Sequence, residues 1–131
     1  MFADTKAFSG FAVDDVAAAK RFYEDTLGLR VSEHDGTLTL HLAGGRDVFV
    51  YEKPDHQPAT YTILNFPVDD IDLAVDALAS KGVRLERYEG FAQDEKGIVR
   101  GDGPPIAWFT DPAGNILAVL EEPEATGTPG G

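Results

Sequence analysis

The feature that most constrains this sequence is an internal repeat. The segment that begins at Phe11, Phe-Ala-Val-Asp-Asp-Val, returns at Phe66 as Phe-Pro-Val-Asp-Asp-Ile. Two further pairs of segments match in the same order, residues 28–31 with 82–85 and residues 45–54 with 114–123. Self-similarity of this kind indicates a duplicated supersecondary unit. We therefore expect a first module at residues 1–58, a second at residues 59–123 and a flexible tail at residues 124–131 that is mostly Gly, Pro and Thr.

Each copy shows the same order of elements. A strand is followed by a helix that opens at an Asp and stops at a Gly, which predicts helices Asp15–Leu27 and Asp70–Lys81. The expected inner face of the second helix consists of Leu73, Ala74, Ala77 and Leu78. The expected strands are 5–13, 29–34, 37–42 and 47–53 in the first module and 61–68, 84–88, 105–110 and 116–122 in the second. Each module therefore has the order βαβββ.

This order predicts an α+β fold. In the strand 37–42 the leucines alternate with Thr37, Thr39 and His41, so one face should be apolar and the other more polar. Eight such strands, with both helices on the outer face, would form a half-barrel whose polar side is a cleft. A cleft of this kind is the default position for a ligand.

The second copy is longer than the first, and its extra residues are expected between Tyr88 and Pro105. The segment 89–104 is rich in Gly and charged residues. Loops of this length in compact domains are often binding loops or mobile lids. A neutral surface insertion is an equally good interpretation.

Composition excludes several classes of function. The chain has no Cys, which rules out disulfides, thiolate metal sites and a thiol nucleophile. Its net charge of −12 disfavours nucleic acid and anionic membranes as partners. No secretory signal and no apolar stretch long enough to span a bilayer is present, so a cytoplasmic location is expected.

Several motifs of this sequence resemble those of a known protein family. These motifs are Val13-Asp14-Asp15, Phe22-Tyr23 and Leu27-Gly28 in the first copy and the turn at 111–115 (Asp-Pro-Ala-Gly-Asn) in the second. In these short motifs and in its paired modules, the sequence resembles the vicinal oxygen chelate superfamily. This group contains glyoxalases, bleomycin-resistance proteins and extradiol dioxygenases. The likeness covers about residues 5–123. It implies a fold and leaves the activity open.

The resemblance also implies where a metal would be held. Enzymes of this family bind a divalent metal through His and Glu side chains on the first and last strands of each module. The matching positions here are Phe8, Phe49, Ile63 and Ala118. None of these side chains is a metal ligand. We therefore expect no metal and no cofactor in those positions.

Apolar and aromatic groups would then form the ligand site. In addition to these four positions, Trp108, Tyr51 and Phe91 are candidates for the walls of the ligand site. His41 and Glu52 are polar candidates for the site. Two alternatives remain: a relocated metal site that uses these residues, or a metal-free catalytic site that uses Glu52, His41 or Tyr51.

These features favour a metal-free binding protein that sequesters a small aromatic or cationic compound, as bleomycin-resistance proteins do in antibiotic resistance. The alternatives are a glyoxalase-like lyase or dioxygenase, and a regulatory protein without a small ligand. We favour a binding protein over an enzyme. The resemblance further implies a homodimer, because open half-barrels of this family commonly complete their clefts across subunits.

Overall fold

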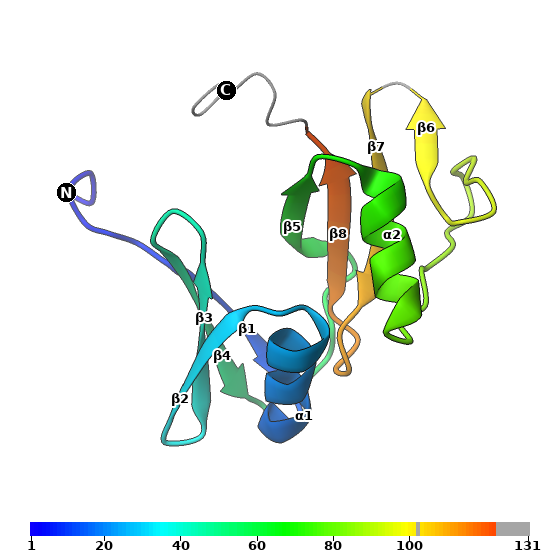
Figure 1. Ribbon diagram of the computed structural model, residues 1–131. Helices are drawn as coiled ribbons and strands as arrows, with labels where there is room; N and C mark the ends of the chain where they lie inside the picture. Colours follow the sequence, from blue (N-terminus) through cyan, green and yellow to red (C-terminus); the bar gives the residue numbers. More distant parts are fainter. Residues whose placement is uncertain (102, 123–131) are drawn as a thin grey trace. The chain divides into compact units, whose positions relative to one another are not determined.

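A computed structural model describes residues 1–101 and 103–122 (Figure 1). The first module contains β1 (Ser9–Val13), α1 (Val16–Arg21), the π-helical turn η1 (Phe22–Thr26), β2 (Arg30–His34), β3 (Thr37–Leu42) and β4 (Arg46–Glu52). The second contains β5 (Thr62–Val68), α2 (Ile71–Ser80), β6 (Val99–Gly101), β7 (Gly103–Thr110) and β8 (Ile116–Glu121). The fold is α+β with two βαβββ modules, as predicted. By its contacts the chain divides into two compact units, the first spanning Met1–Pro58 and the second beginning at Ala59.

The two units share one topology. Each has a four-stranded sheet in which the first strand pairs in parallel with the fourth, giving the orders β1-β4-β3-β2 and β5-β8-β7-β6. The remaining neighbours are antiparallel. A half-barrel cleft built from both sheets stays a prediction. The expected tail, residues 124–131, lies outside the described residues.

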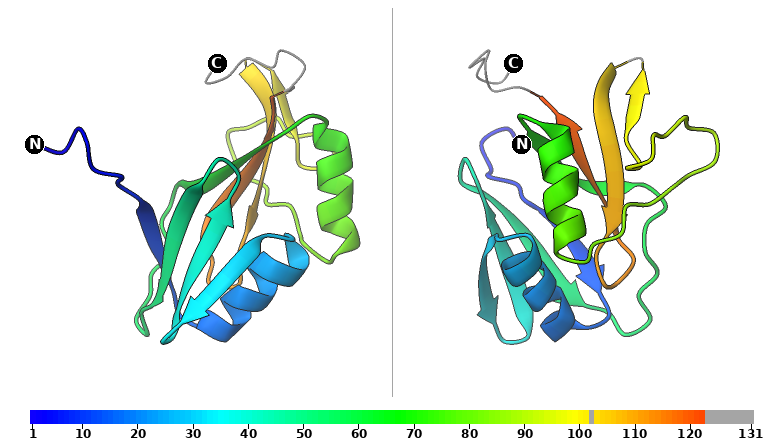
Figure 2. Two further views of the ribbon diagram at one scale, coloured as in Figure 1. Left: turned by 60° about the vertical axis from the view of Figure 1, so that its left-hand side comes forward. Right: turned by 45° about the vertical axis from the view of Figure 1, so that its right-hand side comes forward.

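The helix of each unit packs on one face of its own sheet (Figure 2). The apolar faces beneath α1 consist of Leu38 and Leu40 on β3 and Val48 and Val50 on β4, all buried. This confirms the alternation predicted for the strand 37–42. In the second unit α2 covers the face of β7 and β8 that carries Ala107, Phe109, Leu117 and Val119. No helix in the described part of the chain is long and apolar enough to cross a membrane.

The first helix occupies the predicted range but changes type within it. The Asp15 carboxylate accepts a hydrogen bond from the Ala18 N–H and caps the start. From Phe22 the helix continues as the wider η1 turn, which contains the fully buried Tyr23. The chain then leaves the helix through Gly28, whose φ of 73° is readily adopted by glycine.

The second helix has the predicted length but a different inner face. Its buried residues are Ile71, Val75 and Leu78, whereas Leu73 is 67% exposed. The prediction that Leu73 and Ala77 point inward was therefore wrong, since both are exposed, whereas Ala74 is half-buried and Leu78 is buried as expected. The helix instead buries the larger Ile71 and Val75 together with Leu78. Asp72, beside the exposed Leu73, forms an ion pair with Arg100.

One strand was also misplaced. Residues 84–88 form no strand. The edge strand that pairs with β7 is β6, which lies inside the segment expected to be a loop. The reason is the Gln93 side chain, whose amide donates to the Glu86 carbonyl (2.9 Å) and accepts from the Tyr88 N–H (2.8 Å). Backbone groups that a neighbouring strand would have bound are satisfied by this side chain instead. The Glu86 N–H reaches β7, where it donates to the Trp108 carbonyl at 2.8 Å.

Candidate functional site

The candidate site residues lie mainly on the sheet faces opposite the helices, which we call the open faces. In the first unit the register pairs Thr39 with Phe49 and His41 with Asp47. Directly opposed residues of antiparallel strands point to the same side, so these four share the open face. Phe49 is half-buried and stacks on Tyr51, with ring centroids 5.9 Å apart and an interplanar angle of 21°. This aromatic pair is the first part of the candidate site.

Two other predicted residues of the first unit lie at the ends of strands. Phe8 stands one residue before β1, which starts later than expected, and its side chain is 71% exposed. Glu52 is the exposed last residue of β4 and shares by alternation the side of Val48 and Val50. The structure therefore does not place Glu52 beside His41.

His41 instead takes part in a polar chain across three strands. Its Nε2 lies 2.6 Å from the Ser32 hydroxyl on β2, and its Nδ1 lies 3.1 Å from the Asp47 carboxylate on β4. The sequence analysis identified His41 alone. The Gly44-Gly45 turn between β3 and β4 is the signal that could have placed Asp47 opposite it, because a short turn fixes the register of a hairpin.

The open face of the second unit carries a second aromatic group. Trp108 pairs with Ala118 across β7 and β8, and Ala118 pairs with Asn65 on β5. The ring of Trp108 contacts Tyr88 at 5.5 Å and Phe91 at 5.2 Å. Phe91 is 53% exposed, so part of this group faces solvent. We refer to Tyr88, Phe91 and Trp108 as the Trp108 cluster.

The two remaining candidates differ in accessibility. Ile63 on β5 is half-buried. Ala118 is fully buried between its neighbours on the sheet. Tyr88 was not among the predicted site residues. Burial, with a smaller contribution from Glu86, raises the pKa of the Tyr88 phenol above its usual value.

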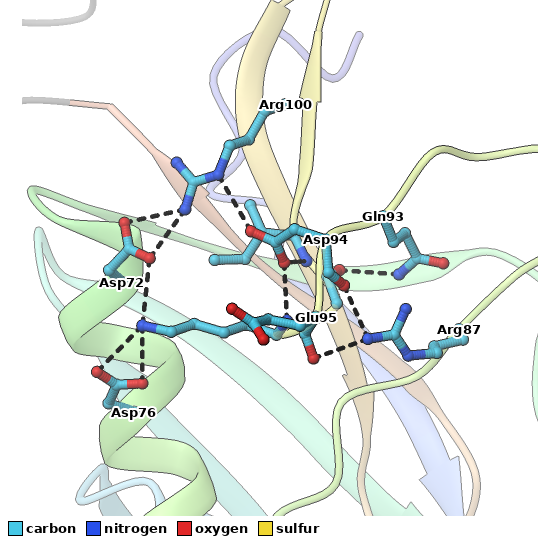
Figure 3. Close-up of polar contacts among 10 residues, drawn as sticks. Asp72, Asp76, Arg87, Gln93, Asp94, Glu95 and Arg100 are labelled. Carbon is cyan, nitrogen blue, oxygen red and sulfur yellow. Dashed lines mark hydrogen bonds and ion pairs between the residues drawn. The ribbon is translucent and has the colours of Figure 1, made fainter.

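The segment that carries Tyr88 and Phe91 is held in place by hydrogen bonds. Gln93 donates to the carbonyls of Glu86 and Gly97, and the Arg87 guanidinium donates to those of Asp94 and Glu95 (Figure 3). Asp94 accepts from the backbone N–H groups of Lys96 and Ile98. These bonds give residues 86–98 a defined conformation without regular secondary structure.

Ion pairs join this segment to α2. The Arg100 guanidinium binds Asp72 through both carboxylate oxygens, at 2.8 and 3.0 Å, and also contacts Asp94 (Figure 3). Lys96 bridges Asp72 and Asp76. The hydrogen bond from Arg100 is the main cause of a lowered pKa at Asp72. Partial burial alone would raise the pKa of Asp94, but hydrogen bonds from Ile98 and Arg100 lower it overall.

The residues in the family's metal positions do not fit a metal. Phe8, Phe49, Ile63 and Ala118 offer no nitrogen or oxygen ligand. Within residues 1–101 and 103–122, no group of three or more His, Asp or Glu side chains is arranged to hold one. The open faces present aromatic rings and, at His41, a hydrogen-bonding side chain.

The turn at Asp111–Asn115 serves the fold. Its Asp111 carboxylate accepts hydrogen bonds from the N–H groups of Ala113 and Asn115 and from the Asn115 side chain, all at 2.9–3.0 Å. Both Asp111 and Asn115 are buried. The residues that carried the family likeness thus close the connection between β7 and β8.

Comparisons with known proteins agree with this architecture. A family model described as the Glyoxalase/Bleomycin resistance protein/Dioxygenase superfamily matches residues 7–119. No curated protein sequence matches the chain significantly.

Solved structures provide more distant likenesses. A glyoxalase family protein from Enterococcus faecalis is 21% identical, with a TM-score of 0.67 over 92% of this chain and 100% of the other. TnmS3, an antibiotic binding protein from Streptomyces sp. CB03234, is 20% identical, with a TM-score of 0.65 over 90% and 97%. A glyoxalase/bleomycin resistance protein from Catenulispora acidiphila is 26% identical, with a TM-score of 0.60 over 89% and 97%. With the duplicated βαβββ topology and the family model in agreement, the chain belongs to the Glyoxalase/Bleomycin resistance protein/Dioxygenase superfamily.

Proposed function

We propose that this protein binds and sequesters a small aromatic compound without using a metal. The observation that carries the proposal is that each unit presents aromatic rings on its open face, the Phe49–Tyr51 stack in the first and the Trp108 cluster in the second. Aromatic rings bind other rings by stacking, an interaction worth about 0.5–1.5 kcal/mol beyond the burial of area. Both groups are partly accessible to a ligand from solvent.

The charge of the chain favours a cationic ligand. A net charge of −12 raises the local concentration of cations around the protein. The faces of Trp and Tyr rings also attract cations, with an energy of about 0.5–2 kcal/mol for each contact. A planar aromatic cation therefore combines both interactions.

The apolar metal positions support binding over the family's metal-dependent reactions. In the first unit Phe8 and Phe49, and in the second Ile63, present apolar side chains that prefer apolar matter to a hydrated ion. The antibiotic-binding description of TnmS3, whose fold this chain shares, also supports this proposal. We further propose that the protein acts as a homodimer, in which each open cleft is completed by the partner subunit.

Titration with a planar aromatic cation such as acridine orange tests this function, with a change in Trp108 fluorescence as the signal. Because stacking contributes about 0.5–1.5 kcal/mol, Phe91→Ala should weaken binding at the Trp108 cluster roughly threefold to tenfold, and Tyr51→Ala should weaken binding at the Phe49–Tyr51 stack, followed by the fluorescence of the dye, by a similar factor. Tyr61→Ala is the matched control, because Tyr61 is 69% exposed and belongs to neither aromatic group. Absence of saturable binding, or equal loss in the control, would contradict the proposal.

Metal analysis of protein purified without a nickel column separates this function from its alternative. We expect less than stoichiometric divalent metal in the purified protein, and added zinc or manganese should not alter binding of the dye. A tightly bound stoichiometric metal would instead support a glyoxalase-like lyase or dioxygenase with a relocated site.

A further inference from the structure

The polar chain of Ser32, His41 and Asp47 has the geometry of a nucleophilic catalytic triad. Ser32 Oγ lies 2.6 Å from His41 Nε2, and His41 Nδ1 lies 3.1 Å from Asp47 Oδ1. Three neighbouring strands supply the residues, with β3 in the middle. Both distances are within the range expected of a nucleophile bound to its base and a base oriented by a third group.

The hydrogen-bond chemistry sets the direction of proton transfer. The Asp47 carboxylate can only accept, so His41 donates to it from Nδ1. In the neutral imidazole Nε2 is then the acceptor, and the Ser32 hydroxyl donates to it. This tautomer is the one in which an imidazole can take the hydroxyl proton while serine attacks.

A large pocket adjoins the triad. Its volume is about 840 Å³, and the same three side chains line it together with Arg30 and the apolar Leu29 and Leu42. The side chain of His41 is 36% exposed and that of Asp47 is 53% exposed, so water can reach the site. A small molecule with an apolar group and a polar reacting centre would find complementary walls here.

We propose that Ser32, His41 and Asp47 form an acyl-transfer site that hydrolyses small carboxylic esters. Ser32 Oγ attacks the carbonyl carbon while its proton moves to His41 Nε2, and the alcohol leaves with that proton. Water then attacks the acyl-serine, which releases the carboxylic acid and restores the hydroxyl. Ser32 and His41 are catalytic residues, and Asp47 is a positioning residue.

Arg30 supplies a charge that suits this chemistry. It lies directly opposite His41 in the pairing of β2 with β3 and lines the same pocket. A guanidinium stabilises the negative oxygen that develops in the tetrahedral intermediate of acyl transfer. This activity goes beyond ligand sequestration and uses neither aromatic group.

Covalent labelling tests the nucleophile. A fluorophosphonate probe should label the wild-type protein at Ser32, as located by peptide mass spectrometry, with release of fluoride. Ser32→Ala should abolish the labelling, and His41→Gln should slow it about 100-fold, since general base catalysis contributes roughly 10²–10⁴-fold. Both side chains are partly or fully exposed, and circular dichroism should show that each variant keeps its fold.

A second His–Asp pair provides the control. His34 contacts Asp35 at 3.2 Å, both side chains are 89% exposed, and neither lines the pocket. His34→Ala should therefore label at the wild-type rate. No labelling of the wild-type protein, or labelling that persists in Ser32→Ala, would overturn the proposal.

The role of Asp47 is tested by turnover of p-nitrophenyl acetate. Asp47→Asn should lower kcat at least tenfold with little change in KM, because it disturbs the orientation of His41 and leaves the pocket intact. The proton NMR signal of His41 Nδ1–H should move in the same variant. An unchanged kcat would refute a positioning role. Dye binding at the aromatic groups should be unaffected in Ser32→Ala, which separates failure here from failure of the proposed sequestration.

Discussion

Gly10 shows how a single residue can support the aromatic open face. It pairs with Phe49 across β1 and β4, and a Cβ placed on it would lie 3.0 Å from the Phe49 carbonyl oxygen and 3.5 Å from its Cβ. The oxygen belongs to a backbone held between two neighbouring strands, so it has little freedom to move. The absence of a side chain at Gly10 therefore permits the close approach of β1 to Phe49.

We expect Gly10→Ala to lower the free energy of unfolding by about 1 kcal/mol, because the methyl group overpacks the contact with Phe49. Gly101→Ala is the control, since a Cβ there meets nothing within 4 Å. The control substitution should leave the free energy of unfolding unchanged or raise it by up to about 1 kcal/mol, because alanine lowers the conformational entropy of the unfolded chain. Urea denaturation measures both. Equal effects would show that the contact with Phe49 is not tight.

Gln93 has a comparable role in the second unit. One side-chain amide satisfies the backbone at Glu86, Tyr88 and Gly97. The pattern of apolar residues in the sequence gives no indication of such a contact, because it depends on where a flexible segment folds back. Ser32 and Asp47 were not identified as neighbours of His41 because their positions depend on the registers of β2 and β4 with β3, whereas the apolar alternation of the strand 37–42 was predicted correctly.

We expect Gln93→Ala to destabilise the protein by about 1–3 kcal/mol, because it leaves partly buried backbone groups without partners. The Trp108 cluster should loosen as well, with a change in the fluorescence of Trp108. Gln57→Ala, at an exposed position, is the control. Hydrogen exchange should show faster exchange of the Tyr88 N–H in the Gln93 variant, and unchanged exchange would contradict this role.

At the scale of elements, the ends of both helices were predictable because their signals are local. Asp15 and Asp70 cap the first turns, and Gly28 and Gly82 follow the last turns with positive φ values. The inner face of α2 was not predictable in this way. Two apolar stripes are present on that helix, and the choice between them depends on contacts with distant parts of the chain, where Asp72 and Asp76 form ion pairs with residues 20 to 28 positions later.

The attachment of the 86–100 segment to α2 should depend on pH. The pKa values of Asp72 and Asp94 are lowered in the folded protein, so their charged forms favour the attached state. This contribution is fully present above the ordinary Asp pKa of about 3.9 and is lost as the pH falls through the lowered values. The segment should therefore loosen only below about pH 4.

Trp108 fluorescence measures this loosening, because Phe91 and Tyr88 contact its ring. Asp72→Asn should reduce the acid transition, since it removes the carboxylate that binds Arg100. Asp55→Asn is the control, because Asp55 forms an exposed pair with Lys53 in the other unit. An identical acid transition in wild type and Asp72→Asn would show that the ion pairs do not hold the segment.

At the scale of the whole molecule, the duplication explains why the topology could be predicted. Once one module was identified as βαβββ, its second copy followed, and both sheets have the same strand order. The same reasoning misplaced the strand at 84–88, because it was assigned by analogy with the first copy. The second copy contains an insertion there, and β6 lies within the insertion.

The stability of the proposed dimer should depend on salt concentration. Two chains that each carry a net charge of −12 repel one another, and salt screens this repulsion over a Debye length of about 10 Å at 0.1 M. If the dimer joins apolar surfaces that complete the clefts, raising NaCl from about 20 to 300 mM should lower its Kd roughly tenfold. Sedimentation velocity at micromolar protein measures this change. A monomer at both salt concentrations would refute the dimer, and a dimer weakened by salt would show that ion pairs, not apolar surfaces, hold it together.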